Sequence, residues 1–208
     1  MKKAIAVLLA LLLAAAMLTA CGAGPGEPTS GAAQVPDGSG ADTPASEGGA
    51  VPEAAKNKNF SDLRSFTADT LGGGTFTEAD FAGKDLTVIN IWGTFCGPCL
   101  AEMEDLAAFE KTLPGNVRLI TLCTDAAGQE STAQRILDDA GYTGITLVSW
   151  DGDLDTLLDD VMYVPTTLFY DANGNCVGTE IIGRQTDFAA AYTAAINDTL
   201  TKLGKDTI

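Results

Sequence analysis

Most predictions of fold and function for this sequence rest on one segment, LTVINIWGTFCGPC at residues 86–99. Its first half is an almost continuous apolar run, typical of a β-strand buried on both faces. The residues after Cys99, LAEMEDL at 100–106, favour a helix. This order of strand, turn, Cys-x-x-Cys and helix places Cys96 at a helix N-terminus, where unpaired backbone N–H groups and the helix dipole favour a thiolate. Because the thiolate is the reactive form of cysteine, the segment indicates thiol–disulfide exchange.

Strand and helix patterns alternate along the rest of the chain, and Asn-Gly at 173–174 is typical of a hairpin turn. The alternation predicts an α/β fold, with a central mixed sheet flanked by helices and parallel, right-handed first crossovers. The predicted elements are a leading hairpin over 66–77, a short helical or turn segment over 78–84, a strand over 86–91, a helix over 96–113, a strand over 117–122, a helix over 131–140, a strand over 146–150, a short helix over 154–161, strands over 166–170 and 176–182, and a closing helix over 187–203.

Residues 1–20 have the composition of a signal peptide. A basic start precedes the apolar run 4–18, and small residues precede Cys21. A transmembrane anchor is the alternative, but the run is short for crossing a bilayer. Residues 21–58 contain few large apolar side chains, which predicts a flexible tether reaching on the order of 30–35 Å. Residues 59–208 have the size of one domain.

The tetrapeptide Leu18-Thr19-Ala20-Cys21 resembles the lipobox of bacterial lipoproteins. This resemblance implies that Cys21 carries lipid and becomes the mature N-terminus, with simple secretion as the alternative. The domain is then expected outside the cytoplasm, anchored to the cell membrane. Cys21 would be unavailable for redox chemistry.

The charge and the residue types narrow the possible functions. The 208-residue chain has a formal net charge of −16, no basic cluster and no histidine. Nucleic acid binding is therefore not expected, and the charge favours solubility. Without histidine there is no Cys–His pair, no histidine metal ligand and no histidine general base. We expect no metal and no cofactor other than a redox-active disulfide.

Two motifs, WGTFCGPC at 92–99 and VPTT at 164–167, together resemble the thioredoxin fold. More narrowly, they resemble the TlpA/ResA group of membrane-tethered thiol–disulfide oxidoreductases. The helix and strand predicted over 131–150, the leading hairpin and the lipoprotein-type start also suit this group. The resemblance covers about 66–203 and implies a thioredoxin-like fold with an N-terminal hairpin and an α-β insertion before a cis-proline strand.

The two cysteines of the motif have different expected roles. Cys96 is the expected nucleophile, because the exposed turn before a helix favours both access and thiolate character. Cys99, one turn into the helix, should attack the mixed disulfide and release the substrate. Two other interpretations are half of a zinc site, which needs two further ligands, and a purely structural disulfide, which closes only a small loop.

The proline motif supplies the expected substrate contact. The resemblance implies that Pro165 is cis and faces the cysteines, and that the backbone of Val164 pairs with a substrate peptide. Alternatively, Pro165 only begins an edge strand. Gly97 and Pro98, also expected at the substrate site, match the dipeptide of reducing thioredoxins.

Glu102, three residues after Cys99, matches a glutamate of the ResA-like group that is implicated in tuning the thiols. Helical spacing puts it one turn from Cys99, and a nearby carboxylate raises a thiol pKa by disfavouring a second negative charge. A solvated helix face is the alternative. Asn90 stands where thioredoxin has a buried aspartate and, being neutral, cannot act as a base. Glu104 stands where the group often has proline.

Aromatic residues and two further cysteines complete the candidates. Phe95 and Trp92 are expected to line the substrate surface, with core packing as the alternative for Trp92. Cys123 is either buried and inert or a third redox thiol. The expected strand order puts two strands between Cys123 and Cys176, too far apart for a disulfide.

The sequence therefore predicts a membrane-tethered protein disulfide reductase that works as a monomer. The resemblance implies a CcdA-like membrane protein as electron donor. It also implies exported partners such as apocytochrome c, a methionine sulfoxide reductase or a sporulation protein. A thiol peroxidase shares the fold, but its Pro-x-x-x-Thr-x-x-Cys pattern is absent. A lipid-anchored binding module with an idle Cys-x-x-Cys is the non-enzymatic alternative.

Overall fold

A computed structural model describes residues 60–208 of the chain. The predicted signal peptide, Cys21 and the tether fall within residues 1–59, which lie outside the described part. Within residues 60–208, no helix is both long enough and apolar enough to cross a membrane.

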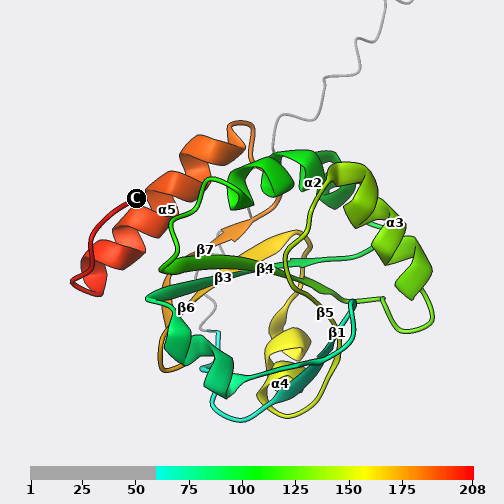
Figure 1. The fold of residues 1–208 in the computed structure, drawn as a ribbon, viewed down its shortest axis with the longest axis horizontal. Coiled ribbons are helices and arrows are strands. Elements are labelled where there is room, and N and C mark those ends of the chain that lie inside the picture. Colours follow the sequence, from blue (N-terminus) through cyan, green and yellow to red (C-terminus); the bar gives the residue numbers. More distant parts are fainter. Residues whose placement is uncertain (1–59) are drawn as a thin grey trace, which may run out of the picture. The chain divides into compact units, whose positions relative to one another are not determined.

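The described residues form one mixed sheet with helices on both faces (Figure 1). Each predicted strand and helix is present, although the helix predicted over 96–113 ends at Glu110, before Pro114-Gly115. The elements are β1 (Thr67–Thr70), β2 (Thr75–Thr77), the 3-10 helix η1 (Glu78–Gly83), β3 (Leu86–Trp92), α2 (Gly97–Glu110), β4 (Val117–Cys123), α3 (Glu130–Ala140), β5 (Thr146–Trp150), α4 (Asp153–Asp160), β6 (Thr166–Asp171), β7 (Cys176–Ile182) and α5 (Phe188–Lys202).

The strand order is β2-β1-β5-β4-β3-β6-β7. Strands β3, β4 and β5 are parallel, whereas β6 runs antiparallel to β3 and pairs Thr166 with Ile91. Trp92, the last residue of β3, pairs with Cys123 on β4. The end of β3 therefore lies beside the start of β6, which brings the segment around Cys96 next to Pro165.

Two hydrophobic clusters lie on opposite faces of the sheet. All seven residues of β3 are buried because both faces are covered, as expected for a central strand. Helices α2, α3 and α5 cover one face, while η1 and α4 cover the other (Figure 1). Alternate residues of β3 serve the two clusters, so that Val88 faces α2 and Ile89 faces η1.

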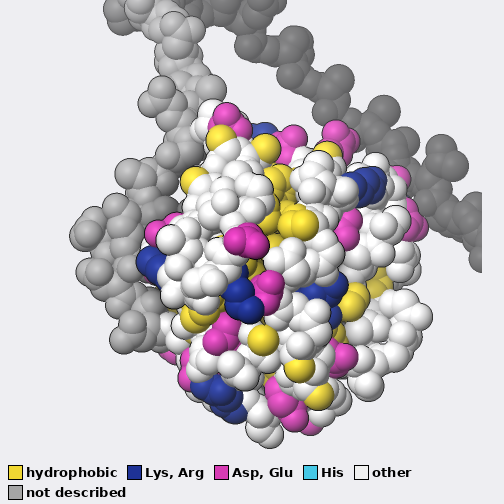
Figure 2. Space-filling view, turned by 60° about the vertical axis from the view of Figure 1, so that its left-hand side comes forward, with side chains coloured by type: hydrophobic (Ala, Val, Ile, Leu, Met, Phe, Trp, Pro, Cys, Tyr) yellow, Lys and Arg dark blue, Asp and Glu magenta, His cyan; other side chains and the backbone are white. Residues whose placement is uncertain are grey.

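Charged side chains are mixed over the surface. On the face shown in Figure 2, Lys and Arg side chains are separated from one another and lie among Asp and Glu side chains. The 12 basic residues are outnumbered by 28 acidic residues in the whole chain.

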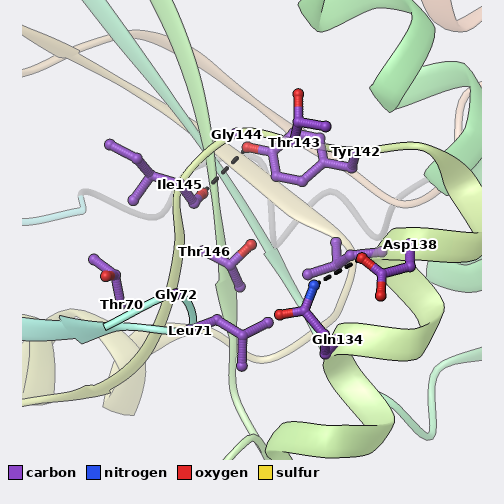
Figure 3. A pocket seen from close by; sticks show the side chains of 11 residues that line it. Thr70, Leu71, Gly72, Gln134, Asp138, Tyr142, Thr143, Gly144, Ile145 and Thr146 are labelled. Carbon is purple, nitrogen blue, oxygen red and sulfur yellow. Dashed lines mark hydrogen bonds between the residues drawn. The ribbon is translucent and has the colours of Figure 1, made fainter. Parts of the chain in front are cut away.

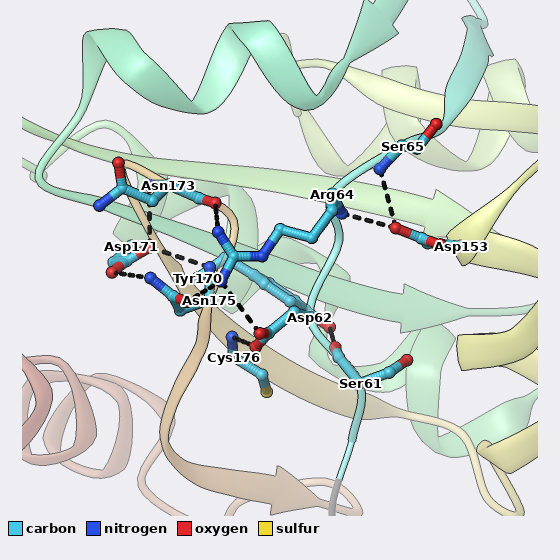
Figure 4. Close-up of polar contacts among 10 residues, drawn as sticks. All are labelled: Ser61, Asp62, Arg64, Ser65, Asp153, Tyr170, Asp171, Asn173, Asn175 and Cys176. Carbon is cyan, nitrogen blue, oxygen red and sulfur yellow. Dashed lines mark hydrogen bonds and ion pairs between the residues drawn. The ribbon is translucent and has the colours of Figure 1, made fainter.

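The segment that precedes β1 is fastened to the β6–β7 hairpin (Figure 4). The backbone N–H of Leu63 donates to the carbonyl of Gly174 at 2.8 Å. The Asp62 carboxylate accepts from the backbone N–H of Cys176 at 2.9 Å. The Arg64 guanidinium donates to the Asn173 carbonyl, the Asp62 carboxylate and the Asn175 side chain. These contacts lie at the end of β6 that is remote from Pro165.

The close approach of Leu63 requires glycine at 174. Gly174 has φ +72°, and an added Cβ would collide with the Leu63 carbonyl oxygen. Gly73 has a similar φ of +83°, but its Cβ would meet nothing within 4 Å.

We predict that Gly174→Ala lowers the free energy of unfolding by about 2 kcal/mol more than Gly73→Ala does. Both substitutions carry the left-handed backbone cost, but only Gly174→Ala adds a steric clash. Urea unfolding of the two variants measures the difference. An equal loss in free energy of unfolding in the two variants would show that the segment before β1 moves away from position 174 at no energetic cost.

Candidate active site

The site lies at the junction between the end of β3 and the start of α2. Cys96 and Cys99 form a disulfide, with their Cα atoms 5.2 Å apart. Cys96 is the N-cap residue of α2, and its sulfur accepts a hydrogen bond from the backbone N–H of Cys99 at 3.2 Å. Pro98 lies in the first turn, where a helix needs no N–H from it. The N–H of Cys99 is thus directed at the Cys96 sulfur, where it and the helix dipole favour a thiolate, while the N–H of Leu100 donates to the Cys96 carbonyl.

The proline segment lies directly against this sulfur. The Val164–Pro165 peptide bond is cis, and the carbonyl oxygen of Val164 lies 3.4 Å from the Cys96 sulfur. The carbonyl of Pro165 accepts from the backbone N–H of Gly183, which follows β7. The cis geometry and the position of Pro165 next to Cys96 confirm the sequence prediction.

Cys96 is less accessible than the predicted exposed turn implied. Only 6% of its surface is exposed, and Cys99 is fully buried. The reason is the close approach of the Val164 carbonyl on one side and the disulfide to Cys99 on the other. Gly97 and Pro98, which follow it in the chain, are exposed.

The two predicted aromatic residues have different environments. Trp92 is fully buried in the cluster beneath α2, so its side chain packs in the core and does not line a substrate surface. Phe95 is 72% exposed. Its ring lies over Gly93, where an added Cβ would come within 2.6 Å of a ring carbon. A glycine at 93 therefore lets Phe95 present its ring beside the disulfide.

Other exposed apolar side chains come from the loop before the cis-proline. Met162 is 72% exposed and Tyr163 is 50% exposed. Both immediately precede Val164, whose carbonyl contacts the Cys96 sulfur. Their position suits contact with a protein partner, a role that the sequence analysis did not assign to them.

The loop before Cys96 is braced by the loop after β4. The Asp125 carboxylate accepts from the backbone N–H of Thr94 at 2.8 Å and from its hydroxyl at 2.5 Å. The Cys123 thiol donates to the same carboxylate at 3.4 Å. Although burial raises the pKa of Asp125, its hydrogen bonds outweigh burial and hold the pKa below its usual value. Sequence reasoning missed this brace, although an acidic residue just past a buried strand was an available signal.

A buried polar cluster lies behind the disulfide. The Asn90 amide nitrogen lies 3.2 Å from Glu102 Oε1, 3.1 Å from Thr167 Oγ1 and 3.2 Å from the Tyr192 hydroxyl. The Thr167 and Tyr192 hydroxyls are 2.7 Å apart. Among the described residues, Glu102 Oε2 and Asn90 Oδ1 have no hydrogen-bond partner. This cluster joins β3, α2, β6 and α5.

Glu102 belongs to this interior and not to a solvated helix face, since only 2% of it is exposed. Burial raises the pKa of Glu102 to about 7. The hydrogen bond from Asn90 and the charge of Arg184 act in the opposite direction, and Asp105 adds to the rise. The carboxyl therefore changes its charge near neutral pH, one helical turn after Cys99.

The two remaining cysteines of the described chain are free thiols. They lie on β4 and β7, with β3 and β6 between them, which confirms the prediction that no disulfide joins them. Burial raises the pKa of Cys123 to about 12 and that of Cys176 to about 11. Neither is a thiolate at neutral pH, and Cys123 is fully buried.

A cavity in the described region lies away from the disulfide. It measures about 360 Å³ and lies between α3, the N-terminal end of β5 and the β1–β2 turn (Figure 3). Its polar groups are engaged with one another, since Gln134 donates to Asp138 and the Tyr142 hydroxyl contacts the Ile145 carbonyl. Within residues 60–208, no three His, Cys, Asp or Glu side chains are grouped to hold a metal ion. The disulfide is therefore the chemically distinctive site.

Comparison with known proteins agrees with this geometry. The sequence matches the Redoxin family over residues 47–196. No curated protein gives a significant match.

Solved structures with a similar fold include several thiol–disulfide proteins. One is a thiol:disulfide interchange protein of the thioredoxin family from Chlorobium tepidum, 21% identical, with a TM-score of 0.51 over 67% of this chain and 98% of the other. Another is a DsbF homologue from Corynebacterium diphtheriae, 20% identical, with a TM-score of 0.55 over 75% and 96%. A third is a secreted Mycobacterium tuberculosis disulfide oxidoreductase homologous to E. coli DsbE, 23% identical, with a TM-score of 0.50 over 62% and 96%. At these identities they establish the fold, and they confirm the predicted thioredoxin-like architecture.

The raised pKa of Glu102 makes stability depend on pH. The unfolded carboxyl loses its proton near 4.5 and the folded one near 7, so the folded state holds more protons in between. The contribution of Glu102 to the free energy of unfolding is therefore greatest below about pH 4.5 and declines as the pH rises to about 7.

We predict that the free energy of unfolding of the oxidised protein falls by about 3 kcal/mol between pH 4.5 and pH 8, relative to that of Glu102→Gln. The glutamine at position 102 cannot ionise in this pH range. Urea unfolding at both pH values measures this difference. Glu104→Gln, an exposed neighbour on α2, is the control and should follow the wild type within about 0.5 kcal/mol. If the stability of Glu102→Gln had the same pH dependence as the wild type, Glu102 would not be the group whose raised pKa causes that dependence.

Proposed function

Because this chain belongs to the Redoxin family and is a thiol–disulfide oxidoreductase of thioredoxin fold, we propose that it acts as a protein disulfide reductase. The observation that carries the proposal is the Cys96 sulfur, held at the start of α2 and 3.4 Å from the Val164 carbonyl. Gly97 and Pro98 add no cationic or hydrogen-bonding side chain between the cysteines. The thiolate is therefore favoured only by the helix N-terminus, which supports a reducing couple.

The reaction proceeds in two exchange steps. The Cys96 thiolate attacks one sulfur of a partner disulfide, and the other partner sulfur leaves as a thiolate that takes up a proton. The Cys99 thiol loses its proton and attacks Cys96, which releases the second partner sulfur. Two electrons have then passed to the partner, and the chain is left with the Cys96–Cys99 disulfide present in this structure.

Backbone and side-chain groups of several residues assist these steps. The backbone of Val164 pairs with an extended partner segment, as a short β-type contact. Phe95 and Tyr163, which are both exposed, provide apolar surface for the partner. Glu102, one helical turn after Cys99, exchanges protons with the thiols, because a buried carboxyl with a pKa near 7 can both accept and return a proton at neutral pH.

The N-terminal sequence supports a location outside the cytoplasm. The signal-like residues 1–20 and the lipobox-like Cys21 would anchor the domain to the membrane, and residues 21–58 would tether it. One protein of similar fold is a secreted oxidoreductase. We therefore place the partners among exported disulfide proteins, such as apocytochrome c, a methionine sulfoxide reductase or a sporulation protein. A CcdA-like membrane protein is the proposed electron donor, and the chain is proposed to act as a monomer.

Reduction of insulin disulfides tests the function directly. With dithiothreitol as electron source, the wild type should accelerate insulin precipitation and Cys96→Ser should not. Cys99→Ser should accumulate a mixed disulfide, because the resolving thiol is absent. Cys176→Ser is the matched control and should keep wild-type turnover, because that free thiol lies on β7 at the far edge of the sheet.

Other results would reject the reductase. Turnover by Cys96→Ser would show that another group is the nucleophile. Absence of turnover in the wild type would favour a binding module, and peroxide consumption without insulin reduction would favour a peroxidase.

The proposed anchor is tested by Cys21→Ala. We expect wild-type protein in the membrane fraction of cells and the variant in the soluble extracytoplasmic fraction, because the lipid attachment point is lost. Fractionation followed by immunoblotting measures the distribution. Continued membrane retention of Cys21→Ala would contradict lipid anchoring at this residue.

A further inference from the structure

The polar cluster behind the disulfide contains more acceptors than donors. The Asn90 amide nitrogen carries two N–H groups, yet three oxygens lie within 3.2 Å of it, from Glu102, Thr167 and Tyr192. Only two of the three can accept a full hydrogen bond at one time. The two hydroxyls therefore compete with the carboxylate for the Asn90 amide.

The carboxylate is poorly supplied with other donors. Glu102 is 2% exposed, and its Oε2 atom has no hydrogen-bond partner among the described residues. A buried carboxylate oxygen without a donor is costly when charged. The strength of the single Asn90 bond to Oε1 therefore matters for the charge state of Glu102.

We propose that Tyr192 is a positioning residue of the redox site, which acts with Thr167 by drawing the Asn90 amide away from the Glu102 carboxylate. Tyr192 is anchored for this role. It lies on α5, 1% exposed, and its ring stacks on Phe188 with centroids 3.9 Å apart. Its hydroxyl is also within 2.7 Å of Thr167 Oγ1.

The other charged groups near Glu102 come from two elements. Asp105, on α2, disfavours the charged form of Glu102, and Arg184, in the loop after β7, favours it. The neighbouring cysteines are joined in the disulfide and do not titrate in the oxidised state. The Tyr192 phenol stays neutral because burial raises its pKa. In the oxidised protein, the hydrogen bond that Asn90 donates to Glu102 is therefore the contribution to the Glu102 charge state that Tyr192 and Thr167 can change.

The consequence concerns the pH range in which the reductase works, and it rests on the proposed function. Burial is the main reason that the pKa of Glu102 lies at about 7, and a weaker Asn90 bond reduces an effect that would lower this pKa. The carboxyl can then give a proton to a departing thiolate and receive one from Cys99 at the same pH. Tyr192 thus tunes the site without touching either sulfur or the partner.

Titration of the Glu102 carboxyl carbon by ¹³C NMR in the oxidised, full-length chain tests the inference. Tyr192→Phe removes one competing hydroxyl and leaves two acceptors for two N–H groups. We expect the Glu102 pKa to fall by roughly half to one pH unit, the size of one net hydrogen bond. Thr167→Val should lower it in the same direction. Tyr142→Phe, which removes an equally buried hydroxyl beneath α3, should leave it unchanged.

An unchanged Glu102 pKa in both Tyr192→Phe and Thr167→Val would overturn the inference. A rise would also overturn it, because it would mean that the amide oxygen and not the nitrogen faces the three groups. Insulin reduction by the wild type is measured in parallel. Wild-type turnover with an unmoved Glu102 pKa rejects only this inference, whereas a lowered pKa without wild-type turnover rejects only the reductase.

Discussion

The approach of the Cys96 sulfur to the Val164 carbonyl, 3.4 Å away, is the contact on which the rest of the site depends. It follows from strand register. Pairing of Ile91 with Thr166 sets the end of β3 beside the start of β6, so the residues just beyond each strand must meet. Helix α2 then begins at the same point, and the backbone N–H of Cys99 in its first turn donates to the sulfur. The Cys96 sulfur thus contacts both the N-terminus of α2 and the backbone of Val164.

Two acidic residues brace or belong to the segments that carry Cys96 and Cys99. Asp125 braces the loop before Cys96 through Thr94, and Glu102 lies buried one turn after Cys99. Both carboxylates make a further negative charge less favourable nearby. The helix terminus favours the thiolate and the carboxylates oppose it. This balance is typical of a couple that gives up electrons readily, because its reduced form gains little extra stability.

The sequence predicted an element correctly where a pattern within one short segment was enough to identify that element. The apolar run of β3, the Cys-x-x-Cys motif and the Asn-Gly turn each predict an element on their own, and the resemblance supplied the cis-Pro165. Accessibility was harder to predict. The low exposure of Cys96 depends on a segment almost 70 residues away, and the burial of Trp92 depends on how α2 covers β3. The competition around Asn90 involves β3, α2, β6 and α5, so no pattern within one element could reveal it.

The standard reduction potential of the Cys96–Cys99 couple decides whether this chain is built to reduce its partners. Equilibration with glutathione or dithiothreitol buffers, followed by alkylation of free thiols, gives the value. We predict a reducing couple, close to the roughly −270 mV of thioredoxin. A value near the roughly −120 mV of the oxidant DsbA would mean that the Cys96 thiolate is strongly stabilised. The assignment of this chain as a reductase would then be wrong.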